Sequence, residues 1–555
     1  MFKSRRNLWW LMMVGVLVLA VPTALLAGPG QTERVSVATD GTPGNEDSEK
    51  PDISGDGRYI AFHSDASNLV PNDTNDASDV FVRDTVSGET TRVSVSSDGE
   101  EGNTHSELPA ISDDGRYVAF LSVADNLVPG DTNLMGDVFV HDIQTGETTR
   151  VSVASDGSES DVLSYSVALS GDGRYVVFAS SATNLVSEDT DLTSDVFVHD
   201  RQTGETTCVS VATDGTKGNL ASSWPAISPD GNYVAFQSYA SNLVSGDTNG
   251  KSDIFVHNVR TGKTLRVSSA ADGTEGNGDA FFATISLDGR YVAFRSAASN
   301  LVPGDTNGVA DVFMRDTQTD ELTLISQGLG GTPANGQSNF VDLSADGRYA
   351  AFQSVASNLI SNDTNAVDIF MHDTETGEIK RVSVASDGTE ANDSAGALAI
   401  AADGGFVAFN SSATNLVSGD TNVSSDIFRH QTDLGNLDSL RIIAVSRVGA
   451  GPMEQGPLDW NVTFSEAVTG VDAGDFVLTT EGSLSDASVA GVSGSGAVYT
   501  VTVSTGAGGG TVRLDISATA TITSLDGDPL SGLPYSRGAA HTVLTKVFLP
   551  LVVRN

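Results

Sequence analysis

The ten residues ISDDGRYVAF at positions 111–120 decide the fold, because the chain contains seven copies of this pattern. The other copies are ISGDGRYIAF (53–62), LSGDGRYVVF (169–178), ISPDGNYVAF (227–236), ISLDGRYVAF (285–294), LSADGRYAAF (343–352) and IAADGGFVAF (400–409). An Asp-Gly pair between two short apolar runs is the strongest local signal for a tight β-hairpin. The pairs recur at intervals of 58 residues five times and 57 residues once, so the sequence predicts a repeat architecture.

Each repeat holds two further strand signals beyond this hairpin. In the second repeat they are DVFVHD at 137–142 and TRVSV at 149–153, joined by a turn at TGE, 145–147. Four antiparallel strands in one repeat of this length are typical of a β-propeller blade. A β-solenoid is the alternative, but solenoid coils are usually shorter and parallel. The sequence therefore favours an all-β, seven-bladed β-propeller with four strands in each blade.

The fourth strand signal is displaced along the chain by one blade. It occurs first as RVSV at 34–37, ahead of any complete repeat, and no copy follows the last third strand, DIFRH at 426–430. Seven outer strands can serve seven blades only if the first of them joins the last blade. We therefore predict that residues 33–38 pair with the final blade and close the ring without an open edge.

The repeat also resembles a known family. The pattern S-x-D-G-R-Y-V-A-F, followed by D-V-F-V-H-D and T-G, resembles the TolB-like, PD40-type (WD40-like) β-propeller repeats, and the resemblance covers residues 33–431. It implies a propeller fold, which we place at 32–431, and an extracytoplasmic setting. It implies no single function, because the family includes scaffolds, ligand binders and the non-catalytic propellers of some peptidases.

A second domain follows a polar linker at 432–439, TDLGNLDS. Strand signals at 440–445, 460–464, 476–480, 497–503 and 511–516 are separated by Gly and Ser turns, as in a β-sandwich. NVTFSEAVTGVDAGDF (461–476) and DGDPL (526–530) are similar to bacterial Ig-like domains, which usually act as spacers or adhesion modules. We predict an Ig-like β-sandwich at 440–545 and a C-terminal tail at 546–555.

The N-terminus and the charge indicate an extracytoplasmic protein, secreted or at the cell surface. Lys3, Arg5 and Arg6 precede an apolar run that ends at Ala27, so residues 1–27 are predicted to be a cleaved signal peptide. An uncleaved membrane anchor is the alternative, since about 20 apolar residues can span a bilayer. A net charge of −42 repels phosphate backbones, and we therefore expect no nucleic-acid partner.

The candidate ligand site is a ring position just before the innermost strand of each blade. Three consecutive repeats place Trp224, Phe282 and Phe340 there, and Tyr165 and Phe281 are close in sequence. Strand order puts the long loops on one face, where propellers bind ligands around the central channel. We predict that these five residues contact an extracellular glycan, peptide or protein. The alternative is that the rings pack between blades or plug the channel.

A second candidate site is the loop signature Asp-Thr-Asn followed by Asp. Oxygen ligands at alternate positions suit Ca²⁺, so calcium is the one cofactor that the sequence indicates. The alternative is an Asx turn, in which Asp and Asn side chains cap loop amides. The predicted ligands are Asp131, Asn133 and Asp137 in the second repeat and Asp247, Asn249 and Asp253 in the fourth.

Five repeats carry a histidine near the end of the third strand signal, such as His141 and His199. These positions are not on the innermost strand, so their side chains are not expected to converge on an ion. We expect them to pair with a neighbouring Asp or with the Glu of the following turn, such as Glu147 and Glu205.

No sequence motif indicates catalysis. The chain has no G-x-S-x-G elbow, H-E-x-x-H, C-x-x-C or phosphate loop, so no catalytic residue is assigned. The sequence predicts a secreted or cell-surface binding or scaffold protein without enzymatic activity. Two alternatives stay open: an extracellular hydrolase that uses carboxylates in the channel, and a structural component of the cell surface.

Overall fold

A computed structural model describes residues 30–432, apart from 188, 190, 365 and 366. In the C-terminal part it describes 440, 442–448, 453–454, 456–464, 467–525, 530 and 540–544. The predicted signal peptide, most of the predicted linker and the predicted tail lie outside these ranges. Among the described residues, no helix has the length and apolar character needed to cross a membrane.

Residues 30–432 form seven four-stranded antiparallel sheets, which we number as blades in chain order. Blade 1 contains β2 (Ser48–Ile53), β3 (Tyr59–Ser64), β4 (Asp79–Asp84) and β5 (Glu89–Arg92). Blade 2 contains β6 (Ser106–Ile111), β7 (Tyr117–Ser122), β8 (Asp137–Asp142) and β9 (Glu147–Arg150). Blade 3 contains β10 (Ser164–Leu169), β11 (Tyr175–Ser180), β12 (Asp195–Asp200) and β13 (Glu205–Cys208). Blade 4 contains β14 (Ser222–Ile227), β15 (Tyr233–Ser238), β16 (Asp253–Asn258) and β17 (Lys263–Arg266).

The remaining blades follow the same order. Blade 5 contains β18 (Ala280–Ile285), β19 (Tyr291–Ser296), β20 (Asp311–Asp316) and β21 (Leu322–Leu324), with a small hairpin of β22 (Gln327–Gly328) and β23 (Thr332–Pro333) after it. Blade 6 contains β24 (Ser338–Leu343), β25 (Tyr349–Ser354), β26 (Asp368–Asp373) and β27 (Ile379–Arg381). Blade 7 contains β28 (Ala395–Ile400), β29 (Phe406–Ser411), β30 (Asp426–Gln431) and, from the N-terminal side, β1 (Thr32–Arg34).

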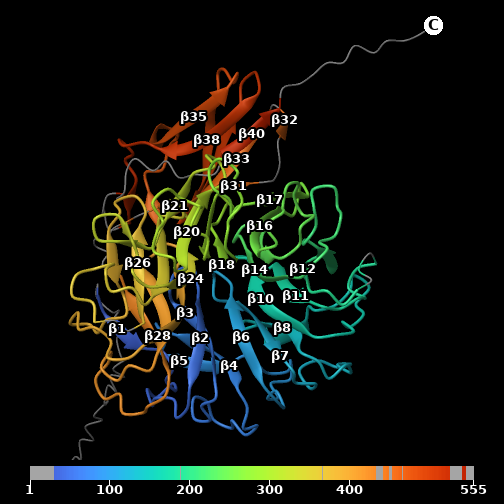
Figure 1. Cartoon of the computed structure of the whole chain (residues 1–555), viewed down its shortest axis with the longest axis vertical. Coiled ribbons are helices and arrows are strands. Elements are labelled where there is room, and N and C mark those ends of the chain that lie inside the picture. The colour runs from blue at the N-terminus through green and yellow to red at the C-terminus, as the bar shows by residue number, and fades with distance from the viewer. Residues whose placement is uncertain are drawn as a thin grey trace, which may run out of the picture.

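The predicted closure of the ring is confirmed. β1 pairs with β30 in the register Thr32↔His430 and Arg34↔Phe428. The innermost strands of neighbouring blades contact one another in succession from β2 to β28, and β28 contacts β2 in turn (Figure 1). Because β1 completes the last sheet, blade 7 has no unpaired outer edge at β30.

A second set of hydrogen bonds ties the blades together at the end of the ring that carries the Asp-Gly turns. There the residue before each Asp-Gly pair donates its N–H to the carbonyl oxygen of its equivalent in the next blade. Six of the seven links are present, and the seventh is missing because Pro229 has no N–H. The bonded pairs are Gly55 to Asp113, Asp113 to Gly171, Gly171 to Pro229, Leu287 to Ala345, Ala345 to Ala402 and Ala402 to Gly55, with N···O distances of 2.7–3.0 Å.

Side chains of the repeat itself shape each Asp-Gly hairpin. In blade 2 the Ser112 hydroxyl donates to the Asp114 carboxylate at 2.6 Å and accepts the N–H of Tyr117 at 2.9 Å. Asp114 also accepts the N–H of Arg116 at 3.0 Å. Gly115 has a φ of +71°, a left-handed conformation that glycine adopts without steric cost. The serine, aspartate and glycine of the pattern therefore each have a structural role in the turn.

The propeller core lies within and between the blades. Phe120 of β7 and Phe139 of β8 are fully buried, with ring centroids 5.9 Å apart. They belong to one apolar cluster with Val80 and Val82 of blade 1, so burial of apolar surface between neighbouring blades stabilises the ring.

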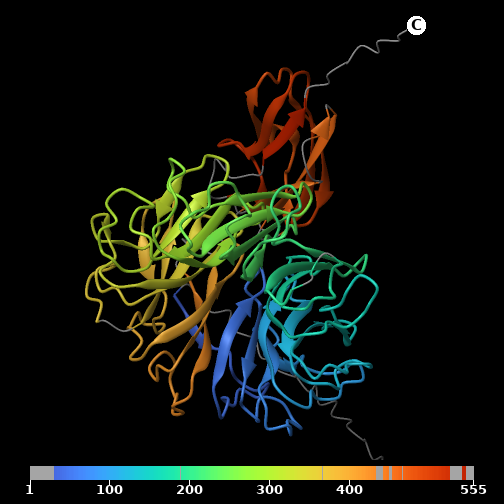
Figure 2. The same cartoon turned by 45° about the vertical axis from the view of Figure 1, so that its right-hand side comes forward.

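The C-terminal strands form a separate β-sandwich (Figure 2). One sheet has the order β31 (Ile442–Val448), β33 (Pro457–Phe464), β37 (Val498–Ser504), β36 (Ser488–Ser495). The other has the order β32 (Met453–Glu454), β40 (Ala540–Leu544), β38 (Gly510–Ile516), β35 (Phe476–Gly482). A short 3₁₀ helix, η1 (Ala473–Asp475), precedes β35, and β34 (Val468–Thr469) pairs with β39 (Thr523–Ser524).

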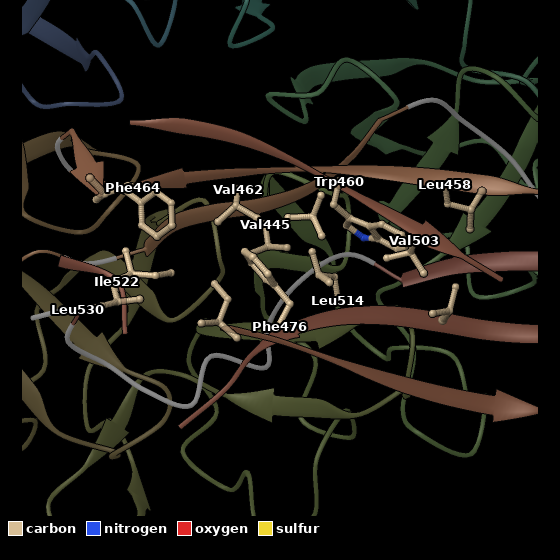
Figure 3. Close-up of a cluster of buried hydrophobic side chains, with 14 of the residues drawn as sticks. Val445, Leu458, Trp460, Val462, Phe464, Phe476, Val503, Leu514, Ile522 and Leu530 are labelled. Atoms are coloured by element: carbon tan, nitrogen blue, oxygen red, sulfur yellow. The ribbon is translucent and has the colours of Figure 1, made fainter. Parts of the chain in front are cut away.

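Both sheets of the sandwich contribute to one apolar core. Trp460 of β33 and Leu514 of β38 are fully buried, and Figure 3 shows their side chains in the space between the strands together with Phe476. Sequence signals identified β31, β33, β35, β37 and β38, but not β36, β40 or the two-residue strands β32, β34 and β39. The resemblance of this domain to bacterial Ig-like domains stays a prediction.

Candidate functional site

A cavity of about 310 Å³ lies among the seven innermost strands. Its size is near the lower end of the range for small-ligand pockets. Each blade contributes two or three consecutive residues of its innermost strand to the lining. The first residue of each group is Lys50, Leu108, Ser166, Trp224, Phe282, Phe340 and Ala397.

Three of the five predicted aromatic residues meet at this cavity. The Trp224 and Phe282 rings are 5.5 Å apart in an edge-to-face arrangement, and the Phe282 and Phe340 rings are 4.9 Å apart. The Lys50 ammonium lies 4.9 Å from the centroid of the Phe340 ring, within the range of a cation–π interaction. Trp224 is 41% exposed, so the cluster keeps aromatic surface available to a ligand.

The structure places these residues within the innermost strands, and not just before them as predicted from the sequence. Trp224 is the third residue of β14, and a β-bulge shifts the pairing between Ser223 and Ala226. Trp224 and Phe282 have φ values of +50° and +54°, in the left-handed region. A bulge turns one side chain out of the regular alternation, so these positions deviate from the usual strand pattern.

The other two predicted aromatic residues do not line the cavity. Tyr165 lies one residue before the lining residue Ser166, and its hydroxyl hydrogen-bonds to Ser194 Oγ. Phe281 packs beside Phe282 with a centroid distance of 6.2 Å and lies 5.9 Å from the Arg295 guanidinium. Both side chains therefore support neighbouring parts of the blades.

Polar groups outside the predicted set of ligand-binding residues also line the cavity. The Ser166 side chain is buried, and its hydroxyl has no hydrogen-bond partner within the part of the chain that the structure describes. Asp52 and Asp342 occupy a position that holds alanine in four other blades and Thr284 in blade 5. The signal that could have identified the two acids is this departure from the alanine that four of the seven repeats have at that position.

Both channel carboxylates bridge neighbouring blades. Asp52 accepts the N–H of Ile111 in blade 2 at 2.7 Å, and Asp342 accepts the N–H of Ile400 in blade 7 at 3.0 Å. Asp342 also accepts the Thr284 hydroxyl of blade 5 at 2.8 Å. Desolvation raises the pKa of Asp52 to about 7, and the charge of Asp342 adds to this effect.

The predicted calcium ligands of blade 2 surround a protein cation. Arg150 Nη1 lies 3.3 Å from Asp131 Oδ1, 3.5 Å from Asp137 Oδ2 and 2.9 Å from Glu159 Oε1. Asn133 donates to Asp137 at 3.2 Å, and its Oδ1 accepts a backbone N–H two residues further on, as in an Asx turn. The three carboxylates are close enough together to hold an ion, but the guanidinium already supplies a positive charge there.

Blade 4 repeats this arrangement. Arg266 Nη1 lies 3.6 Å from both Asp247 and Asp253, and 2.8 Å from Glu275. Asn249 donates to Asp253 at 3.3 Å. Calcium binding by the loops of blades 2 and 4 stays a prediction, and the arginine between the carboxylates argues against it.

No family model matches the sequence, and no curated protein matches it. Similar solved structures include an oligogalacturonate lyase from Vibrio parahaemolyticus, with 14% identity and a TM-score of 0.44, covering 73% of this chain and 98% of that one. They also include TolB from Acinetobacter baumannii, with 13% identity and a TM-score of 0.33, covering 68% of this chain and 80% of that one. A putative TolB from Agrobacterium tumefaciens has 13% identity and a TM-score of 0.34, covering 62% and 95%.

The strand-three histidines have partners other than those expected. His141 and His199 each lie 2.9 Å, through Nδ1, from the hydroxyl of a fourth-strand threonine, Thr148 and Thr206. Their Nδ1 hydrogen bonds therefore go to threonine hydroxyls, whereas the neighbouring aspartates, Asp142 and Asp200, act on the rings through their charge. Desolvation lowers the pKa of both histidines, which favours the neutral ring. They contribute to packing within the blade.

Proposed function

We propose that the protein is a secreted or cell-surface binding protein that receives an apolar or aromatic side chain of a peptide or protein ligand in its channel cavity. The observation that carries the proposal is the meeting of Trp224, Phe282 and Phe340 at one cavity, with Trp224 partly exposed. Aromatic side chains at such positions dominate the energetics of many interfaces. The C-terminal sandwich would act as a spacer.

The lining favours a peptide side chain over a sugar. Most of its residues are alanine, proline, leucine, valine or aromatic. Sugars need several hydrogen-bond partners, whereas the Asp52 and Asp342 carboxylates already accept backbone N–H groups. Ser166 and Lys50 remain to orient the ligand. The large negative charge of the chain favours a ligand that is neutral or positively charged overall.

The test is a comparison of peptide and glycan arrays probed with the purified chain. We expect peptides with aromatic or large apolar residues to bind, and Trp224→Ala to weaken the best of them by about tenfold or more, roughly 1.4 kcal/mol. Tyr239→Ala is a matched control, because Tyr239 is similarly exposed, at 44%, but does not line the cavity. Unchanged binding by Trp224→Ala would refute the cavity as the site, and binding to glycans alone would refute the peptide class.

A second candidate is an extracellular hydrolase that uses Asp52 and Asp342. The raised pKa of both carboxyl groups in one cavity favours it, because hydrolases often pair an acid with a base of this kind. We prefer the binding function because each carboxylate joins two or more blades through hydrogen bonds. This preference would be reversed if the wild type turned over a substrate and a correctly folded Asp52→Asn variant did not.

A further inference from the structure

Each blade holds a pair of aspartates, one in the loop after its second strand and one at the start of its third strand. In six blades a side-chain cation lies within 3.6 Å of both carboxylates. In blade 1, for example, Arg92 Nη1 lies 3.5 Å from Asp73 and 3.1 Å from Asp79. The six cations are Arg92, Arg150, Lys217, Arg266, Arg381 and Arg34, in blades 1, 2, 3, 4, 6 and 7.

Blade 3 shows that the cation is retained even where the arginine is lost. Cys208 occupies the arginine position, facing Phe197 as Arg150 faces Phe139. Lys217 occupies the position of Glu159, and its ammonium contacts both Asp189 and Asp195. The equivalent pair of carboxylates in blade 3 therefore also has a positive charge beside it, although the charge comes from a different position of the repeat.

Blade 5 has neither cation. The arginine position is Leu324, which faces Phe313, and the glutamate or lysine position is Pro333. In the described part of the chain, no Lys or Arg side chain forms an ion pair with Asp305 or Asp311, unlike the equivalent aspartates of the other blades.

The two aspartates of blade 5 are nevertheless buried. Asp305 is 6% exposed, and its Oδ1 has no hydrogen-bond partner among the described residues. Asp311 is fully buried and accepts from Ser326 Oγ at 2.7 Å and from Asn307 Nδ2 at 2.6 Å. Burial raises the pKa of Asp311 to about 6, and the charge of Asp305 contributes to that rise. An uncompensated pair of buried carboxylates is costly unless a cation joins it.

We propose that blade 5 binds a calcium ion between Asp305 and Asp311, in the place that a lysine or arginine group takes in the other six blades. Two carboxylates match a divalent charge, and their oxygens are the ligands that Ca²⁺ prefers. Water molecules would complete its six to eight ligands. Mg²⁺ fits less well because it requires near-ideal octahedral geometry. With only two protein carboxylates, we expect a dissociation constant on the order of 10⁻⁴–10⁻³ M, as in extracellular calcium modules.

The experiment is a titration of the chelator-treated full chain with CaCl₂, followed by calorimetry and by thermal unfolding in physiological salt. We expect one calcium ion per chain and a higher melting temperature with calcium than with chelator. Asp305→Asn should abolish both effects. Leu324→Arg should also abolish them, because it supplies the guanidinium that blades 1, 2, 4, 6 and 7 carry, and it should raise the melting temperature measured in chelator.

Asp131→Asn is the matched control, because Asp131 is the equivalent aspartate in blade 2, where Arg150 is present. It should bind calcium as the wild type does. The proposal is overturned if the wild type binds no calcium, or if binding survives in Asp305→Asn. It is equally overturned if Asp131→Asn, and not Asp305→Asn, loses the ion, since the loop of blade 2 would then be the site. Should Leu324→Arg fail to fold, the two asparagine variants still decide the question.

Discussion

At the scale of single residues, one position of the innermost strand carries an ionisable carboxylate in two blades and alanine in four others. Asp52 lies where blades 2, 3 and 4 have Ala110, Ala168 and Ala226. Its pKa of about 7 in the folded protein is above the ordinary value of about 3.9 expected in the unfolded chain. Between these values the folded state holds a proton that the unfolded state has released. The contribution of Asp52 to stability is therefore fully present below about pH 4 and is lost as the pH rises through about 7.

We predict that Asp52→Asn makes the free energy of unfolding less dependent on pH between 5 and 8. The asparagine retains an oxygen that can accept the Ile111 N–H but cannot ionise. The difference between wild type and variant should change by roughly 2–4 kcal/mol across this range, at about 1.4 kcal/mol for each pKa unit. Urea unfolding at several pH values measures it. Asp125→Asn, at an exposed position, is the control and should keep the wild-type profile. The same slope in both variants would contradict the prediction.

Single site residues could be predicted from the sequence where the same residue type recurs in every repeat. The Asp-Thr-Asn loops were identified as oxygen clusters, but their cation was not, because Arg150 lies 13 residues beyond Asp137 on another strand. Only strand pairing brings the two together. Likewise, Tyr165 is adjacent to the cavity residue Ser166 in sequence, yet its hydroxyl bonds to a neighbouring loop.

At the scale of elements, the Asp-Gly hairpin also joins neighbouring blades. Gly115 lies against the Tyr59 ring of blade 1, where an added Cβ atom would be 2.1 Å from Tyr59 Cδ2. The tyrosine of one repeat therefore covers the glycine of the next repeat. The pattern S-x-D-G-R-Y thus contains the residues of the turn and also the residues that join neighbouring blades. The sequence predicted the hairpins from the turn alone. It missed the bulge of the innermost strand, because alternation of apolar residues does not show where pairing slips.

We predict that Gly115→Ala destabilises the protein more than Gly157→Ala does. Both glycines have a positive φ, +71° and +84°, so each substitution adds backbone strain of about 1–2 kcal/mol. A Cβ atom on Gly115 would meet the Tyr59 ring, whereas a Cβ atom on Gly157 would have no described atom within 4 Å. Overpacking should add a further ~1–3 kcal/mol at Gly115. Denaturant unfolding measures both losses, and equal values would show that the contact with Tyr59 contributes nothing.

At the scale of the whole molecule, a count of strand signals was enough to predict how the ring closes. Blade 7 lacked a fourth strand, and residues 33–38 were the one strand signal without a blade. The place of Trp224, Phe282 and Phe340 around the channel was predicted from the sequence, but the full lining of the cavity could not be predicted in the same way. Its lining depends on which side chain of each innermost strand faces the axis, and the bulges at Trp224 and Phe282 set that orientation.

The closing strand should therefore control the stability of the whole propeller. Removing residues up to 38 takes away the N–H of Val35 that bonds to Ile427, and the Arg34 side chain that joins Asp420 and Asp426. Those two carboxylates would then lie close together without a cation, a loss of about 3–5 kcal/mol for a buried pair, and the edge of β30 would be open. We expect the melting temperature of this variant to fall by roughly 5 °C, with a broader transition in calorimetry. A chain that ends at residue 432 is the control, because it keeps β1 and all seven blades while lacking the sandwich. If the control loses as much stability in its propeller transition as the N-terminal deletion does, closure by β1 is not what holds the ring together.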